Sequence, residues 1–273
     1  MPELPEVETV RRSLKMHLEG RTIKGVGGEA VNLRRPLDPE TLARALIGRC
    51  LVGFRRRGKF LLVDLDDGSV VLFHLGMTGR LQIAAPSEPR LPHNHLVLGL
   101  DDGRELRYAD SRRFGLVDWL ASGTEAVDPS LSRLGIEPFD PALREVLPPL
   151  LHKRRAPLKA LLMDQRLVAG VGNIYAAEAL WRSRIRPTRA GNRTSLARLA
   201  ILARNVQGVL GEAIAQGGTT LRDYATPEGE LGYFALKLEV YGRQGESCRC
   251  CGATLRAEVI GGRTTVWCVG CQT

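Results

Sequence analysis

Four cysteines near the C-terminus have the spacing of a metal site. Cys248 and Cys251 form one CxxC turn, and after sixteen intervening residues Cys268 and Cys271 form another. Four thiolates at this spacing suit a tetrahedral zinc ion that closes a β-hairpin finger, and an all-cysteine shell leaves no open position for substrate. We therefore predict one structural Zn²⁺, and a redox role for the two CxxC turns is the alternative.

The other two cysteines stand outside this pattern. Cys250 lies inside the first CxxC turn, where a CxC pair would be strained around one metal, and Cys50 is isolated in an apolar stretch and is expected in the core. Because most of the cysteines gather in one motif, zinc is favoured over disulfides, as in a reducing compartment.

A glycine-rich segment lies between the two cysteine pairs. Gly261-Gly262-Arg263-Thr264-Thr265 is typical of a hairpin tip, and it would present Arg263 outward. A guanidinium held on a rigid finger is suited to a DNA phosphate. An exposed arginine taken by itself is more often only solvated.

Three basic clusters lie on other segments of the chain. The sequence carries 39 Lys and Arg against 30 Asp and Glu, a formal charge of +9, and this excess must lie on the surface. If the clusters face one groove, they form a track for the phosphates of a polyanion, and the alternative is three unrelated solvated faces. In a strand, Lys59 would point opposite to Phe60 and into a cleft. The clusters are Arg55-Arg56-Arg57 with Lys59, Lys153-Arg154-Arg155 with Lys159, and the arginines between residues 182 and 189.

The sequence shows no signal for membrane insertion or export. No apolar run approaches the roughly 20 residues that a membrane span requires. The N-terminus has neither the basic start nor the apolar stretch of a signal peptide. We expect a cytoplasmic protein without a membrane partner.

The first half of the chain is expected to form one leading helix and many short strands. Apolar residues recur from Val7 to Leu18 with the spacing of one helical face, and Gly20 is expected to end the helix. Between residues 50 and 120, short runs rich in Val, Leu and Phe are joined by the turn signals Asp67-Gly68 and Asp102-Gly103. This pattern predicts a β-sandwich that carries the N-terminus on a helix.

The second half of the chain is expected to be helical. Pro157 fits the first turn of a helix that runs to about residue 165, and residues 173–181 form another, so Gly170-Val171-Gly172 is the turn between them. Thr194 or Ser195 can cap a longer helix that ends at Gly217-Gly218.

The opening residues Met1-Pro-Glu-Leu-Pro-Glu-Val-Glu-Thr-Val10 resemble the N-terminus of bacterial formamidopyrimidine-DNA glycosylases of the MutM type. The resemblance covers essentially the whole chain, through separated motifs in the same order. It implies an α+β protein with an N-terminal β-sandwich and leading helix, a helical helix-two-turn-helix domain and a C-terminal β-hairpin zinc finger. The other motifs are His74 to Gly79, Ser111 to Gly115, Leu167 to Tyr175, Gly217 to Thr220 and the four-cysteine finger.

We expect four parts along the chain. Residues 1–135 form the catalytic domain, residues 136–150 an interdomain hinge, residues 151–235 the helix-two-turn-helix domain and residues 236–273 the zinc finger. The hinge holds four prolines, which favour irregular backbone.

The resemblance implies a bifunctional DNA glycosylase and AP lyase of base excision repair that removes 8-oxoguanine and formamidopyrimidines. Once Met1 is removed, Pro2 presents a secondary amine with a pKa near that of an α-amino group, roughly 8, so an appreciable neutral fraction exists at pH 7. This amine would attack the sugar C1′. The resulting iminium acidifies the C2′ hydrogen and drives elimination of the 3′ and then the 5′ phosphate.

The same match implies roles for the residues around the nucleophile. Glu3 is the acid/base partner that assists opening of the sugar ring, whereas Glu6 and Glu8 are better explained as first-turn helix carboxylates. Lys59 resembles the lysine that contacts the lesion phosphate and assists β-elimination. Arg263 resembles the finger arginine of the second elimination.

An enzyme that acts on a base inside a duplex must flip it out and fill the hole. The family's three void-filling residues map onto Met77, Arg112 and Phe114, of which Met77 and Phe114 taken alone would more often be core residues. At the N-terminus of a helix, Asn173 independently favours an anion. The residues that would hold DNA are His93, Arg112, Arg154, Lys159, Asn173 and Tyr241.

The sequence leaves two alternatives to a glycosylase for oxidised purines. An endonuclease VIII-like enzyme shares Pro2 and Glu3 but prefers oxidised pyrimidines, and a zinc-bearing DNA-binding module without catalysis is the second alternative.

The segment from Thr219 to Tyr233 could form a lid over the extruded base. The expected partner is double-stranded DNA with oxidised bases or abasic sites, bound by a monomer at the bacterial nucleoid.

Overall fold

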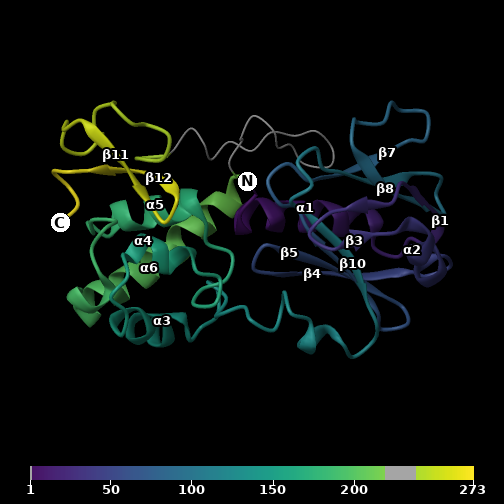
Figure 1. Ribbon diagram of the computed structural model, residues 1–273, viewed down its shortest axis with the longest axis horizontal. Helices are drawn as coiled ribbons and strands as arrows, with labels where there is room; N and C mark the ends of the chain where they lie inside the picture. The colour runs from purple at the N-terminus through teal and green to yellow at the C-terminus, as the bar shows by residue number, and fades with distance from the viewer. Residues whose placement is uncertain (1, 219–237) are drawn as a thin grey trace. The chain divides into compact units, whose positions relative to one another are not determined.

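The computed structural model describes residues 2–218 and 238–273 (Figure 1). The chain divides into two compact units. The first runs to Ser132 and takes in Gly217 and Gly218, and the second runs from Arg133 to Gln216 and takes in the C-terminal residues. The division falls close to residue 135, where the sequence places the end of the first domain. The lid expected over residues 219–233 lies outside the described residues.

Helix α1 (Leu4–Leu18) begins the first unit and carries the predicted apolar face. The backbone N–H of Glu3 donates to Glu6 Oε2 at 2.8 Å, which is one half of a capping box and supplies a partner to a donor at the start of the helix. The apolar side chains from Val7 to Leu18 are buried, and the chain leaves the helix before Gly20, whose φ of 85° suits only glycine. The predicted helix is therefore confirmed.

Two antiparallel four-stranded sheets follow α1, with strand orders β1-β8-β9-β7 and β10-β6-β5-β4. The predicted hairpins at Asp67-Gly68 and Asp102-Gly103 join β5 to β6 and β8 to β9. The first sheet consists of β1 (Ile23–Gly28), β7 (Arg80–Ala84), β8 (Asn94–Leu100) and β9 (Glu105–Ala109). The second consists of β4 (Leu51–Arg57), β5 (Phe60–Leu65), β6 (Val70–His74) and β10 (Leu116–Leu120).

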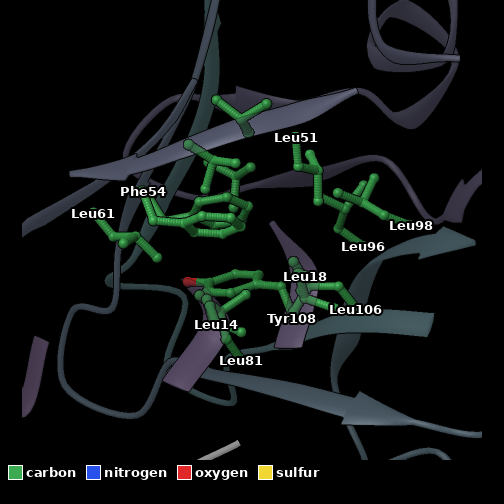
Figure 2. Packing of buried hydrophobic residues seen from close by; sticks show 14 of the residues in the cluster. Leu14, Leu18, Leu51, Phe54, Leu61, Leu81, Leu96, Leu98, Leu106 and Tyr108 are labelled. Atoms are coloured by element: carbon green, nitrogen blue, oxygen red, sulfur yellow. The ribbon is translucent and has the colours of Figure 1, made fainter. Parts of the chain in front are cut away.

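One hydrophobic core joins α1 to both sheets, which confirms the β-sandwich with a leading helix. Figure 2 shows Phe54 of β4 and Leu61 of β5 on one side of this core and Leu96 and Tyr108 of the other sheet across from them. Leu14 of α1 packs into the same cluster. Because α1 is buried along one face, its first residues are held by the core of the unit.

The sequence analysis missed helix α2 (Pro39–Leu46). The signal for it is present: Asp38 is the N-cap and accepts from the backbone N–H of Glu40 at 3.1 Å, and Pro39 follows at the first helical position. The shorter elements of this unit are β2 (Val31–Asn32), β3 (Pro36–Leu37) and the 3₁₀ turn η1 (Glu125–Val127).

Among the residues that the structure describes, the second unit contains four α-helices, three of which match the predicted segments. These are α4 (Leu158–Met163), α5 (Asn173–Arg182) and α6 (Leu196–Ala215), and Ser195 caps α6 by accepting from Arg198. The 3₁₀ turn η2 (Gly191–Arg193) precedes α6. Along the part of the chain that the structure describes, no helix combines the length and apolar character needed to cross a membrane.

Helix α3 (Leu143–His152) occupies much of the segment that we assign to a hinge from the sequence. From residue 143 onward the segment is helical, where its prolines led us to expect irregular backbone. Pro148 and Pro149 each remove a backbone donor from the helix, but Leu143, Leu147 and Leu151 form a fully buried stripe. Burial of these leucines, on a helix that packs against α6, outweighs the lost hydrogen bonds.

The C-terminal hairpin has the predicted form. Strand β11 (Leu255–Ile260) pairs with β12 (Arg263–Cys268), and the turn residues Gly261 and Gly262 have φ values of 58° and 72°. A two-residue hairpin turn with both φ values positive requires such residues. Cys50, which we expect in the core, is only partly buried and lies in a bridge with Thr22.

Candidate functional site

Pro2 and Glu3 lie together at the start of α1, and both are buried in the first unit. Glu3 is the N-cap residue of the helix and only 2% exposed. Its backbone is fixed by Glu6, so the neighbouring carboxylate of Glu6 performs the structural task that we expect of a first-turn acid. The carboxyl group of Glu3 is thus placed beside the residue that would carry the nucleophile.

Glu8 has a structural role as well, because it binds Arg56, which belongs to one of the predicted basic clusters. Burial by itself would raise the pKa of Glu8, but hydrogen bonds and charge from Arg11, Arg12 and Arg56 hold it below its usual range. Arg56 Nε lies 3.3 Å from Glu8 Oε2. Arg55 is also bound to carboxylates, since it donates hydrogen bonds to Asp64 and Glu125, and these bonds raise its pKa.

The cluster at residues 55–57 is therefore largely neutralised within its own unit. Arg55 and Arg56 are tied to carboxylates and offer less charge to phosphates than the sequence suggests. Lys59 is 7% exposed and lies in the turn between β4 and β5, just before β5 begins, so the strand alternation does not fix its direction.

His74, which the sequence analysis did not single out, lies next to this turn at the end of β6. Burial and the positive charges of Arg34 and Lys59 lower its pKa to about 3. Its Nδ1 accepts from the backbone N–H of Gly76 at 3.0 Å, and its ring packs against Phe60 with centroids 4.8 Å apart. A neutral imidazole thus anchors Gly76, in the loop that carries Met77.

The three proposed void-filling side chains come from two loops of the first unit. Gly76 and Phe114 are in direct backbone contact, because a Cβ on Gly76 would lie 2.4 Å from the carbonyl carbon of Phe114. The guanidinium of Arg112 lies over the ring of Phe114, 4.9 Å from its centroid, and Phe114 is 46% exposed. The structure thus brings the loop that carries Met77 against the loop that carries Arg112 and Phe114, and the last two side chains meet at the surface.

Asp110 is the residue that ties these loops to the sheet, and the sequence analysis missed it. Its fully buried carboxylate accepts from the Thr78 hydroxyl at 2.5 Å and from the backbone N–H of Gly115 at 2.7 Å. The backbone N–H of Arg112 also points to it at 3.3 Å. One carboxylate therefore bonds both loops, and the signal for it is its place in the run Asp110-Ser111-Arg112 directly after a strand.

The backbone of His93 is hydrogen-bonded to the backbone of Asp110. His93 is exposed, its φ is 63°, and its carbonyl accepts from the backbone N–H of Asp110 at 3.0 Å. A positive φ is uncommon outside glycine, and the hydrogen bond from Asp110 helps to hold the His93 backbone in this conformation. Buried Arg107 donates to the carbonyl oxygens of Ala85 and Glu88 and so holds the loop that leads to His93.

In the second unit, Asn173 stands at the N-terminus of α5, as predicted. Its Oδ1 accepts from Lys159 Nζ at 2.7 Å, and its Nδ2 donates to the carbonyl of Thr264 on β12 at 3.2 Å. Lys159 also donates to the Thr265 hydroxyl at 3.1 Å and is fully buried. Lys159 therefore ties α4, α5 and the finger together, and it can act on DNA only through the residues that it positions.

Tyr241 is positioned by a buried carboxylate on α5. Glu178 accepts from the backbone N–H groups of Glu239, Val240 and Tyr241 at 2.9 to 3.0 Å. Burial raises the pKa of Glu178. Arg154 and Arg263, by contrast, are exposed, and Arg263 lies at the start of β12 beside the hairpin turn.

The four cysteines of the finger are brought together as predicted. Their sulfur atoms all lie within 4.8 Å of one another, with Cys248 and Cys271 3.8 Å apart and Cys251 and Cys268 3.3 Å apart. Tetrahedral zinc with Zn–S bonds of about 2.3 Å needs sulfurs that are about 3.8 Å apart, so the cluster fits that ion. Cys250 stays outside the cluster, because its thiol accepts from Arg184 at 3.2 Å.

Two family models match the chain. The formamidopyrimidine-DNA glycosylase N-terminal domain matches residues 1–117, and the formamidopyrimidine-DNA glycosylase H2TH domain matches residues 134–225. Curated formamidopyrimidine-DNA glycosylases from Xanthomonas axonopodis pv. citri and Novosphingobium aromaticivorans are each 48% identical to the chain, over the whole length of both sequences.

Solved structures with the same fold agree with these matches. The MutM (Fpg) protein from Thermus thermophilus is 40% identical, with a TM-score of 0.89 over 99% of this chain and 98% of that one. A MutM complex with DNA that contains carbocyclic 8-oxo-G has a TM-score of 0.90 at 34% identity and full coverage of both chains. A Lactococcus lactis Fpg complex with abasic-site DNA has a TM-score of 0.89 at 33% identity over 99% of both chains.

Proposed function

Because the chain belongs to the formamidopyrimidine-DNA glycosylase family, it is a DNA glycosylase for oxidised purines, and we propose that Pro2 is its nucleophile. The endonuclease VIII alternative is not supported, since the full-length matches at 48% identity are formamidopyrimidine-DNA glycosylases. The observation that carries the proposal is the placement of Pro2 directly before Glu3 at the buried start of α1. AP lyase activity is a known feature of the family.

The glycosylase step uses both residues. The lone pair of the Pro2 nitrogen forms a bond to C1′ as the bond between C1′ and the base breaks, and the proton of the resulting ammonium passes to the departing base, which restores the nitrogen lone pair. Glu3 gives a proton to the ring oxygen, the ring opens, and the nitrogen lone pair forms an iminium with C1′. A carboxyl group beside the amine suits this transfer because it needs no movement of the backbone.

The lyase steps follow from the same adduct. The positive iminium nitrogen draws electrons from C2′, a base removes the C2′ proton, and the bond between C3′ and the 3′ phosphate oxygen breaks. A second elimination breaks the bond to the 5′ phosphate, and water then releases Pro2. Lys59 holds the phosphate of the lesion during the first elimination, and Arg263 assists the second.

The remaining candidates hold the duplex open. Met77, Arg112 and Phe114 fill the space that the extruded base leaves, and Asp110 keeps their two loops in place. His93, Arg154, Asn173 and Tyr241 contact phosphates, and buried Lys159 fixes the direction of Asn173. The four cysteines bind a structural Zn²⁺, which supplies rigidity and no chemistry. One chain carries every role, so the enzyme acts as a monomer on nucleoid DNA.

Borohydride trapping tests the nucleophile. When borohydride is added during turnover of a duplex that contains 8-oxoguanine, it should reduce the iminium and leave DNA covalently attached to Pro2, as found by peptide mapping. Retention of Met1 should abolish trapping, because the nitrogen is then an amide, and should leave duplex affinity unchanged. A crosslink that maps onto Lys59, or base release that survives the blocked N-terminus, would remove the assignment.

The activity of Glu3→Gln on two substrates tests the role of Glu3 as the acid. Glu3→Gln should lose base excision more completely than strand cleavage at a preformed abasic site, because Glu3 protonates the ring oxygen and an abasic sugar already exists in part as the ring-opened aldehyde. Glu8→Gln is the matched control, since Glu8 is occupied by arginines, and it should affect both substrates equally. Duplexes with thymine glycol in place of 8-oxoguanine should be poor substrates for the unaltered enzyme.

A further inference from the structure

A basic pocket on the second unit has no part in the roles assigned above. Its volume is about 1020 Å³, and it is formed by residues 186–193, by the β11–β12 hairpin and by the segment that precedes α4. No aspartate or glutamate side chain is found among the residues that line it. The arginines that line it are Arg155, Arg186, Arg189, Arg193 and Arg256.

These five arginines differ from several other arginines of the second unit, which are bound to acidic side chains. Arg182 binds Glu212, Arg166 binds Asp164 and Arg243 binds Glu246. Within residues 2–218 and 238–273, none of the five arginines forms an ion pair with an acidic side chain. Five like charges around one hollow repel one another, so an anion bound there gains attraction from all of them.

The walls of the pocket are rigid and partly apolar. The carbonyl of Arg189 accepts from the backbone N–H of Leu158, and Gln272 donates to the carbonyl of Ile185 at 2.9 Å. The guanidinium of Arg186 lies over the ring of Trp267, 4.6 Å from its centroid. Val269, at the end of the hairpin, adds an exposed apolar side chain beside these charges.

The shape of the pocket discriminates between anionic partners. A DNA duplex presents its phosphates on a convex surface, whereas these arginines line a hollow. Single-stranded nucleic acid binds through bases that stack on open aromatic faces, but Trp267 is 7% exposed and covered by Arg186. A peptide can enter the hollow with its carboxylates in the forks of the arginines and an apolar side chain against Val269.

We propose that this pocket is a docking site for an acidic, partly apolar peptide segment of another protein. The proposal does not depend on the roles given to Pro2 or to the void-filling loops. Arg155, Arg186 and Arg189 belong to clusters that the sequence predicts to face phosphates, so DNA is the competing occupant. Arg193 and Arg256 belong to neither cluster, are exposed and line separate walls of the pocket, which makes them suitable for a test.

The test is fluorescence anisotropy with a labelled peptide of glutamates and leucines, and with the same peptide carrying glutamine in place of glutamate. The unaltered enzyme should bind the acidic peptide and not its glutamine counterpart. Arg193→Ala with Arg256→Ala should weaken binding by at least about tenfold, because two charge-assisted hydrogen-bond donors are lost. The control pair Arg133→Ala with Arg204→Ala removes the same charge from exposed sites outside the pocket and should change binding less than about twofold.

Competition with DNA decides between the two occupants. The acidic peptide should also bind enzyme that is already saturated with a lesion duplex, and the pocket variant should cleave that duplex at the normal rate. Displacement of the peptide by duplex, together with weaker duplex binding by the pocket variant, would identify a phosphate surface and overturn the proposal. Equal loss of peptide binding in the pocket and control variants would also overturn it, since only net charge would then matter.

Discussion

The proposed void-filling loops of the first unit and the finger of the second unit both hold an exposed arginine in place, but by different means. Arg112 sits on loops that a buried carboxylate, Asp110, ties to a sheet of a large shared core. Arg263 sits on a two-stranded hairpin whose own cluster of buried residues is small and includes three of the cysteines. A short hairpin cannot bury enough apolar surface to fix its tip, so the metal site takes the place of a core.

The largest effect is expected from the finger. Cys268→Ser should release the proposed zinc, whose binding supplies about 10 to 16 kcal/mol in zinc fingers, and should unfold the hairpin while the sandwich stays folded. Duplex affinity should then fall by at least about tenfold, or roughly 1.4 kcal/mol. Metal analysis and titration of a labelled duplex measure both quantities.

Cys250→Ser is the matched control for this prediction. Its thiol is exposed and bonded to Arg184, outside the four-sulfur cluster, so metal content and duplex affinity should both be retained. Unchanged duplex affinity in a Cys268→Ser protein that has lost its metal would show that the finger does not need the ion, and the comparison with the loops would fail.

A smaller loss is expected from the loops. Asp110→Ala leaves a hydroxyl and backbone donors without their buried acceptor and should lower the free energy of unfolding by about 2 to 4 kcal/mol. Excision of 8-oxoguanine from a duplex should fall further than cleavage at a preformed abasic site, because the loops serve extrusion of the base. Denaturant titration and single-turnover rates on both substrates measure these changes.

Met77→Ala and Arg112→Ala separate the loops' function from their stability. Both side chains reach the surface, so either change should reproduce the difference between the two substrates with little loss of stability. Equal losses on the duplex and on the abasic site would remove the void-filling assignment.

His74, which anchors the loop that carries Met77, should make the free energy of unfolding depend on pH. The pKa of His74 is about 3 in the folded protein and is lowered from its ordinary value of 6.5, so below pH 6.5 the unfolded chain takes up a proton that the folded one does not. Stability from this group is present above pH 6.5 and is lost as the pH falls toward 3. From pH 7 to pH 5 the loss should be about 2 kcal/mol.

Denaturant titration at the two pH values checks this expectation. His74→Gln carries a neutral side chain at both, so the part of the pH dependence that comes from this histidine should disappear even if the variant is less stable throughout. A variant that keeps the full pH dependence would show that other groups cause it.

The smallest effect concerns two basic clusters. Arg154 is exposed, and Arg154→Ala should reduce the slope of log affinity against log salt by about 0.9, the value for one phosphate contact. Arg55→Ala is the control, because Asp64 and Glu125 already bind Arg55, and it should leave the slope nearly unchanged. If Arg55→Ala reduced the slope more than Arg154→Ala, the cluster at residues 55–57 would face DNA.

The sequence predicted those elements whose signals are local. The periodicity from Val7 to Leu18, the turn signals Asp67-Gly68 and Asp102-Gly103 and the two CxxC turns each correspond to observed structure. Helix α2 was missed although its N-cap, Asp38, is also a local signal. Part of the segment expected to be irregular is the helix α3, because the buried leucines of that helix outweigh the effect of its prolines.

The sequence by itself determined which residue types were available: an N-terminal Pro2-Glu3 pair, four cysteines at zinc spacing and an excess of positive charge. Only the tertiary structure decided which charges remain available, because Arg55 and Arg56 meet carboxylates that are distant in sequence. It also decided that Lys159 is buried and that Asp110 joins two loops. Such pairings depend on strand register and on burial. These bring together groups that are far apart in the sequence, so local spacing does not predict them.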